Sequence, residues 1–180
     1  MADSARDIVP RAVKQIPAEM AEYFLCFSVF EKCLKERDSR YLTILSGGGF
    51  KVNHSTFFSE VLRDSNDLSA KIMELSPVIR SKPPRKQIFA DGRVGFNMLQ
   101  SRRMNAADVL DALPRIRNNL FHGGKWPSGP EDESARDRDL LREATDILLL
   151  VLDWCVSSED SDLAAVGREF RHGLAKLAAA

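Results

Sequence analysis

Residues 19–37 read EMAEYFLCFSVFEKCLKER, and this stretch decides the fold class. Its large apolar side chains recur at spacings of four, three and four residues, at Tyr23, Phe27, Phe30 and Leu34. Side chains at these spacings share one face of an α-helix. The stretch therefore predicts an amphipathic helix that buries this stripe against other helices.

A second helical region is expected from Ser55 or Thr56, either of which is a suitable N-cap. The polar run at 64–67 is expected to split this region in two. Its apolar positions are Phe57, Val61, Leu68, Ile72 and Leu75. Between the first two helical regions, the glycines at 47–49 break the periodicity, and we interpret them as a flexible loop.

Three more helices are expected in the second half of the chain. Asn105 is the expected N-cap of one, with Asp108 in its first turn, and Pro114 should kink it or start a second helix. Ser134 with Asp137 resembles a capping box for the next helix. The apolar stripes are Val109, Leu113, Ile116 and Leu120; Leu141, Ala144, Leu148, Val151 and Cys155; and Leu163, Val166, Phe170, Leu174 and Leu177. Together these patterns predict an all-α fold, an antiparallel bundle of about five helices.

Length and composition favour a single domain over residues 1–180, since the chain has 180 residues, of which 44% are hydrophobic. We expect residues 1–17 to form an N-terminal arm. Residues 76–104 are expected to form an irregular basic loop, because three prolines interrupt any helical pattern there. Within it, 88–90 and 94–96 flank an Asp-Gly turn signal and either pair as a small hairpin or belong to a packed loop.

Three cysteines, Cys26, Cys33 and Cys155, form no CxxC pair and fit a reducing compartment. Cys26 and Cys33 share a helix face, where buried thiols behave as small apolar groups. The first residues lack the apolar core of a signal peptide, and no apolar run is long enough to cross a bilayer. A cytoplasmic protein without membrane contact is therefore expected.

Basic and acidic residues are equal in number, 26 of each, but unevenly distributed. Residues 80–103 hold seven basic side chains and one acidic one, whereas residues 131–162 hold eleven acidic side chains and three arginines. Either both segments are solvated and their opposite charges offset each other, or the basic segment is a loop that binds phosphates.

Nucleotide-binding and hydrolase motifs are absent from the sequence, and its three histidines, His54, His122 and His172, are dispersed without metal-binding companions. We expect neither a cofactor nor a metal site. The candidate chemistry lies in residues 115–125, which read RIRNNLFHGGK. In a helix Arg117 and His122 are about 140° apart, so they converge only if the helix ends near His122 or a second copy completes the site.

A guanidinium, carboxamides and an imidazole at one helix end suit phosphodiester cleavage without a metal ion. Histidine moves protons near neutral pH, and arginine holds phosphate oxygens and offsets charge in the transition state. RNA supplies its own nucleophile, the 2′-hydroxyl, and is the expected substrate. The structural alternative is that these cations only stabilise the negative end of the helix dipole.

The string from Arg117 to His122 resembles the Arg-polar-x-x-x-His signature of the HEPN superfamily (higher eukaryotes and prokaryotes nucleotide-binding domains). The longer string 115–125 is most similar to Apea-like and related prokaryotic branches. The resemblance implies a helical homodimer with one composite site, and a metal-independent endoribonuclease of toxin–antitoxin, phage-defence or RNA-processing systems. Its partners would be single-stranded RNA or a tRNA loop, and an antitoxin or another regulatory protein.

Carried across by position, Arg117 would bind the phosphate in the transition state, Asn118 would be the polar residue and His122 the catalytic histidine. Arg115, Asn119 and Lys125 are expected as secondary phosphate contacts. Trp126 either stacks a base or packs beside Pro127. Gly124 stands where one toxin branch has a tyrosine that its antitoxin modifies. The alternative function is a non-catalytic helical module that dimerises or docks a partner.

Overall fold

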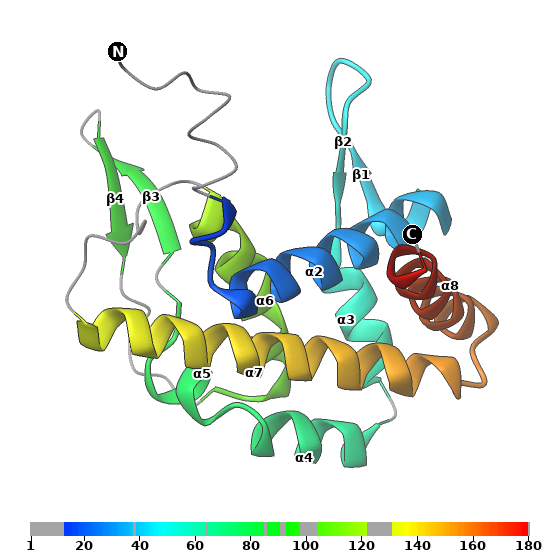
Figure 1. The fold of residues 1–180 in the computed structure, drawn as a ribbon. Helices are drawn as coiled ribbons and strands as arrows, with labels where there is room; N and C mark the ends of the chain where they lie inside the picture. Colours follow the sequence, from blue (N-terminus) through cyan, green and yellow to red (C-terminus); the bar gives the residue numbers. More distant parts are fainter. Residues whose placement is uncertain are drawn as a thin grey trace.

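The computed structural model describes residues 13–37, 39–63, 65–84, 86–90, 93–97, 104–121 and 131–179, with 86–90, 93–97, 121 and 131–134 as backbone only. These residues are mostly helical, which confirms the expected all-α class (Figure 1). The helices are α2 (Ala18–Arg37), α3 (His54–Leu62), α4 (Asn66–Glu74), α5 (Pro77–Ser81), α6 (Ala106–Phe121), α7 (Glu131–Val156) and α8 (Ser161–Ala178), with the short 3-10 helix η1 (Ser39–Tyr41). Two hairpins, β1 (Leu42–Ile44) with β2 (Phe50–Val52) and β3 (Lys86–Ala90) with β4 (Arg93–Asn97), complete the described elements.

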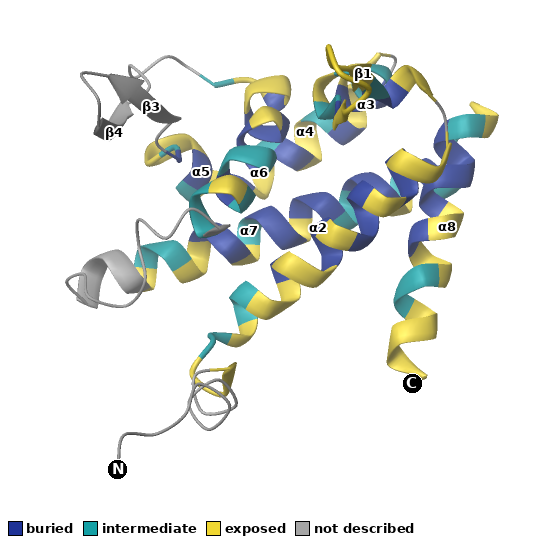
Figure 2. Ribbon diagram, turned by 90° about the horizontal axis from the view of Figure 1, so that it is seen from above, coloured by how far each residue is buried: buried dark blue, intermediate teal, exposed yellow. Residues whose placement is uncertain are grey.

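The longest of these helices, α7, forms the centre of the bundle. It packs against α2 and α8 at one side and against α4, α5 and α6 at the other, and α2 also packs on α8 (Figures 1 and 2). Most of the predicted stripe residues lie in one apolar core, including all four from α2. Leu75 and Leu177 are exceptions, because both end their helices at exposed positions. The periodicity was therefore a sound guide to which helix faces are buried.

The expected glycine loop at 47–49 is instead the turn of the first hairpin. Strand β1 pairs antiparallel with β2, and Leu42 lies opposite Val52. Gly47 and Gly48 have φ angles of 107° and 83°, values that side chains on Cα disfavour. The glycines are therefore the residues that let two three-residue strands fold back on each other.

Residues 76–104 were expected to be irregular, with a small hairpin as one alternative around the Asp-Gly turn, and the expectation was wrong for residues 77–81. Pro77 begins α5, at a position where its missing N–H costs nothing. The carboxylate of Glu143 on α7 accepts hydrogen bonds from the N–H of Val78, at 2.7 and 3.0 Å, and from that of Ile79, at 2.9 Å. Further on, β3 and β4 form the hairpin that was one of the two alternatives.

The predicted helix starts were partly correct. Asn105 and Asp108 cap α6 reciprocally, since each side chain accepts a hydrogen bond from the backbone N–H of the other, at 2.9 and 3.0 Å. Helix α3 is capped by Asn53 and not by Ser55 or Thr56, because the Asn53 carboxamide reaches the N–H of Thr56.

Helix α7 differs from the prediction at its start, and in α6 one of the two alternatives for Pro114 is excluded. Helix α7 begins at Glu131, before the predicted capping box of Ser134. Pro114 starts no second helix, since α6 continues through it. The Tyr23 hydroxyl of α2 donates a hydrogen bond of 2.7 Å to the Leu113 carbonyl, immediately before this proline.

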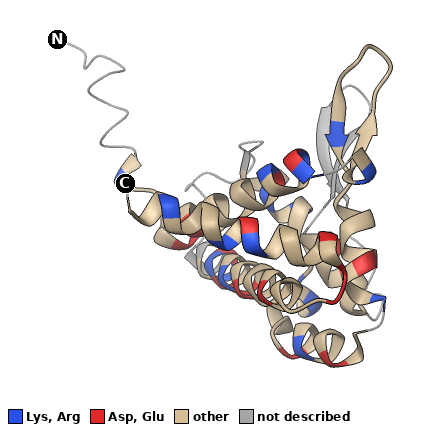
Figure 3. Cartoon of the chain, turned by 90° about the vertical axis from the view of Figure 1, so that its right-hand side faces the viewer, with Lys and Arg blue, Asp and Glu red and all other residues tan. Residues whose placement is uncertain are grey.

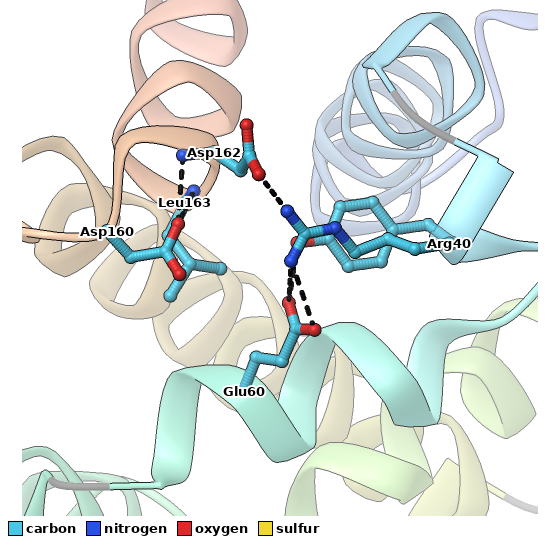
Figure 4. A network of polar contacts seen from close by, with 6 residues as sticks. Arg40, Glu60, Asp160, Asp162 and Leu163 are labelled. Atoms are coloured by element: carbon cyan, nitrogen blue, oxygen red, sulfur yellow. Dashed lines mark hydrogen bonds and ion pairs between the residues drawn. The ribbon is translucent and has the colours of Figure 1, made fainter.

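An ion-pair network joins α3 and α8 to the chain that follows α2 (Figure 4). Arg40 contacts Glu60 of α3, at 3.3 Å, and Asp162 of α8. The Tyr41 hydroxyl donates to the same Glu60 carboxylate at 2.7 Å. Elsewhere, acidic and basic residues are interspersed over the helices (Figure 3), and Arg171 of α8 pairs with Asp153 of α7 at 2.8 Å. The acidic stretch 131–162 is therefore partly neutralised by neighbouring arginines, whereas the side chains of the basic stretch 85–103 lie outside the described residues.

The three cysteines are buried free thiols, as expected. Burial raises the pKa of all three, that of Cys33 to about 11 and that of Cys155 to about 12. Because the thiolate is the reactive form, we expect the folded protein to resist iodoacetamide and the urea-unfolded protein to take up three labels, as counted by mass spectrometry. Rapid labelling of the folded protein at any of the three sites would contradict this prediction.

Candidate functional site

Four of the six predicted site residues lie on the last two turns of α6. Its Val109 and Ile116 are buried in the core, so the opposite edge of the helix is left for polar side chains. Arg115, Arg117, Asn118 and Asn119 all belong to this end of the helix. His122 and Lys125, with Gly124 and Trp126, lie outside the described residues.

Arg117 makes a polar contact with α2 and another with its neighbour on α6. Its Nη2 lies 3.0 Å from Oε2 of Glu31, and its Nη1 donates a hydrogen bond of 2.9 Å to Oδ1 of Asn118. The guanidinium also lies over the ring of Phe27, 5.9 Å from the ring centre. The side chain nevertheless keeps 35% of its surface exposed. Arg117 and Asn118 thus contact each other, and Arg117 also contacts a carboxylate that the sequence analysis did not include.

Glu31 is the centre of this arrangement. Its side chain is only 10% exposed, and its carboxylate meets Nε2 of His54 at 3.1 Å and Nζ of Lys35 at 3.6 Å, besides Arg117. Burial alone raises the pKa of Glu31, but the hydrogen bond from His54 and the charge of Arg117 outweigh it and hold the pKa below the ordinary 4.5. We call these five residues, Glu31, Lys35, His54, Arg117 and Asn118, the Glu31 cluster.

His54 is the first residue of α3, and its ring is 15% exposed. The ring packs against Phe27 and Phe30, whose ring centres are 5.4 and 6.0 Å away. An ionised carboxylate only accepts hydrogen bonds, so Nε2 must carry the proton that Glu31 receives. The orientation and the tautomer of this imidazole are therefore both set by α2.

The other predicted contact residues of α6 are less closely tied to the cluster. Arg115 is half-buried and lies near Asp111. Burial raises the pKa of Asp111, and the charge of Arg115 offsets only part of this rise. Asn119 is half-buried as well. The structure thus brings Arg117 and Asn118 into the Glu31 cluster and leaves Arg115 beside a different carboxylate.

Glu31 and His54 were missed by the sequence analysis. Glu31 carried a signal, because it follows Phe27 by four residues and precedes Leu34 by three, so that it stands on the apolar stripe of its helix. A charge at such a position needs a buried partner. His54 had no comparable signal, since only the packing of α3 on α2 brings it to Glu31.

Within the described ranges, no three His, Cys, Asp or Glu side chains are grouped in a way that would hold a metal ion. The helices described there include none that is long and apolar enough for a membrane span. A hollow of about 270 Å³ lies at the start of α4, lined by Ser65, Asn66, Asp67, Leu68 and Trp154, and shares no residue with the Glu31 cluster. We compared the chain with protein-family models, curated proteins and solved structures, and none of them matches it.

Proposed function

We propose that this protein is a metal-independent endoribonuclease of the HEPN type. The observation that carries the proposal is the placement of Arg117, the first residue of the Arg-polar-x-x-x-His string. Its guanidinium is fixed by a buried carboxylate and by Asn118, while about a third of the side chain stays exposed. A fixed and accessible guanidinium is what stabilisation of a phosphorane-like transition state requires.

In this reaction a base removes the proton of an RNA 2′-hydroxyl, whose oxygen then attacks the adjacent phosphorus. Arg117 pairs with the non-bridging oxygens as negative charge gathers on them. The bond from phosphorus to the 5′-oxygen breaks, and an acid gives that oxygen a proton. The products are a 2′,3′-cyclic phosphate and a 5′-hydroxyl, and His122 is one of the two proton-transfer groups.

The proposed assembly is a cytoplasmic homodimer in which the motifs of two copies face each other across a two-fold axis. Single-stranded RNA or a tRNA loop is the substrate, and Arg115, Asn119 and Lys125 contact its flanking phosphates. A toxin–antitoxin or phage-defence role, with an antitoxin or another regulatory protein as partner, goes with this proposal.

A specific observation favours the second candidate, a non-catalytic helical module that dimerises or binds a partner. Glu31 joins α2, α3 and α6 through His54 and Arg117, and such a satisfied buried network stabilises a fold without any chemistry. The two candidate functions predict different effects of replacing the motif histidine, His122, on activity and on stability. An enzyme loses activity but keeps its stability, whereas a structural histidine is needed for stability.

The test is cleavage of end-labelled RNA in EDTA by the unaltered protein and by His122→Ala. We expect His122→Ala to be slower by about 100-fold or more, with an unchanged melting temperature, because it removes a proton-transfer group. The matched control is His172→Ala, which removes an exposed histidine of α8 and should cleave normally. Cleavage products that lack cyclic-phosphate ends, or equal rates for both variants, would contradict the proposal.

A further inference from the structure

The cleavage reaction needs two proton transfers, one at the attacking 2′-oxygen and one at the leaving 5′-oxygen. The string at 115–125 contains a single histidine. The Glu31 cluster contains a second one, His54, and the same carboxylate contacts both this imidazole and Arg117. A proton-transfer group and the phosphate-binding guanidinium are therefore held next to each other within one copy of the chain.

We propose that His54 is a catalytic base of this ribonuclease, with Glu31 as the residue that positions it. The inference rests on the proposed function and adds a residue to the same site. In the cleavage step, Nδ1 of neutral His54 takes the proton of the 2′-hydroxyl as the oxygen–phosphorus bond forms. The other proton-transfer group of the proposed function gives its proton to the 5′-oxygen as the phosphorus–oxygen bond breaks, so protons and electron pairs balance.

The orientation of the ring supports the role of base. Nε2 donates to Glu31, so the remaining nitrogen, Nδ1, carries the lone pair in the neutral ring. In the described part of the chain, the one enclosed side-chain nitrogen or oxygen without a hydrogen-bond partner is Nε of Arg136. Nδ1 of His54 is not among these enclosed atoms, and the His54 side chain keeps 15% of its surface exposed, so this is the nitrogen we assign to the substrate hydroxyl.

The surroundings of the ring support the same role. Phe27 and Phe30 fix its plane, and the charged groups around it are Glu31 and Lys35 of α2 and Arg117 of α6. When His54 takes up a proton, the cation that forms lies against the Glu31 carboxylate. A buried carboxylate that orients an imidazole and stabilises its charged form is an established device of general-base catalysis.

The decisive variant is His54→Gln, because the glutamine amide nitrogen can still donate to Glu31 but cannot transfer a proton. We expect its cleavage rate in EDTA to fall about 100-fold or more, while its melting temperature and its affinity for a non-cleavable 2′-O-methyl RNA stay unchanged. Its pH–rate profile should lose the ionisation of the base. His172→Gln is the matched control and should behave as the unaltered protein.

The outcomes separate this inference from the proposed function. If the unaltered protein cleaves RNA and His54→Gln cleaves it at the same rate, His54 is structural and only the inference is overturned. If the unaltered protein cleaves no RNA, both are overturned. Should His54→Gln fold poorly, ¹⁵N NMR of the unaltered protein decides. We expect the Nε2–H tautomer of His54, and we expect the chemical shift of Nδ1 to change when the 2′-O-methyl RNA binds. An unchanged Nδ1 chemical shift would overturn the inference.

Discussion

Replacing Glu31 by glutamine is expected to lower the free energy of unfolding by about 3 kcal/mol at neutral pH. The substitution keeps the shape of the side chain and removes the one negative charge shared by Arg117, His54 and Lys35. Breaking a buried ion pair costs more than an exposed one, because the partner charge stays behind without compensation. The expected cost lies at the lower end of the range for broken buried pairs, about 3–5 kcal/mol. The reason is that the side chains of Arg117 and Lys35 remain 35% and 42% exposed.

The effect depends on pH in a direction that follows from the lowered pKa of Glu31. A carboxyl whose pKa is lower in the folded state stabilises the fold above its ordinary pKa, here 4.5. That stabilisation is lost as the pH falls through the folded-state value. The stability difference between the unaltered protein and Glu31→Gln should therefore be constant above about pH 5 and shrink below pH 4.5.

Urea denaturation at several pH values measures this difference. Glu36→Gln, on the same helix, is the control, because Glu36 pairs with Lys32 at 3.8 Å and both side chains are more than half exposed. Its expected cost is about 0.5 kcal/mol or less at every pH. Equal costs for the two variants would show that the Glu31 carboxylate does not hold the three elements together.

The helices could be predicted from the sequence because the apolar spacings and capping residues that indicate them are local. The stripe of α2 and the reciprocal cap of Asn105 and Asp108 each lie within one stretch of chain. Helix α5 could not be predicted in this way, since the carboxylate that caps it comes from Glu143, more than 60 residues later. The strands around the glycine turn are three residues each, too short for a period of two to be recognised.

The candidate site was predicted only where its residues are neighbours in sequence. Arg117 and Asn118 stood out because their types and spacing form one string. Glu31 and His54 are 86 and 23 positions away from the groups they meet, Arg117 and Glu31 respectively. Such a contact depends on how α2, α3 and α6 pack, and no local pattern encodes that packing. The one local sign was a carboxylate on an apolar stripe, which indicates that a buried partner exists but not which residue it is.

Replacing Gly167 by alanine is expected to destabilise the protein by about 2 kcal/mol, although alanine favours helices more than glycine does. Gly167 lies where α8 packs against the backbone of α7. A Cβ there would be 2.7 Å from the carbonyl oxygen of Leu152 and 2.7 Å from the backbone nitrogen of Val156. Both are backbone atoms of α7, so no side-chain rotation relieves the overlap and the helices must move apart.

Gly173, six residues further along α8, is the matched control. A Cβ at this position would be 2.9 Å from Cγ1 of Val29, a side-chain methyl group that can move by rotation. Both substitutions gain about 1 kcal/mol of helix propensity, so their difference compares an overlap with the α7 backbone to an overlap with one side chain of α2. Thermal unfolding should show Gly167→Ala melting roughly 5 °C below the unaltered protein and Gly173→Ala close to it. Equal melting temperatures for the two variants would mean that α8 can shift on α7 at little cost, and that the close contact of these helices does not determine the stability of the bundle.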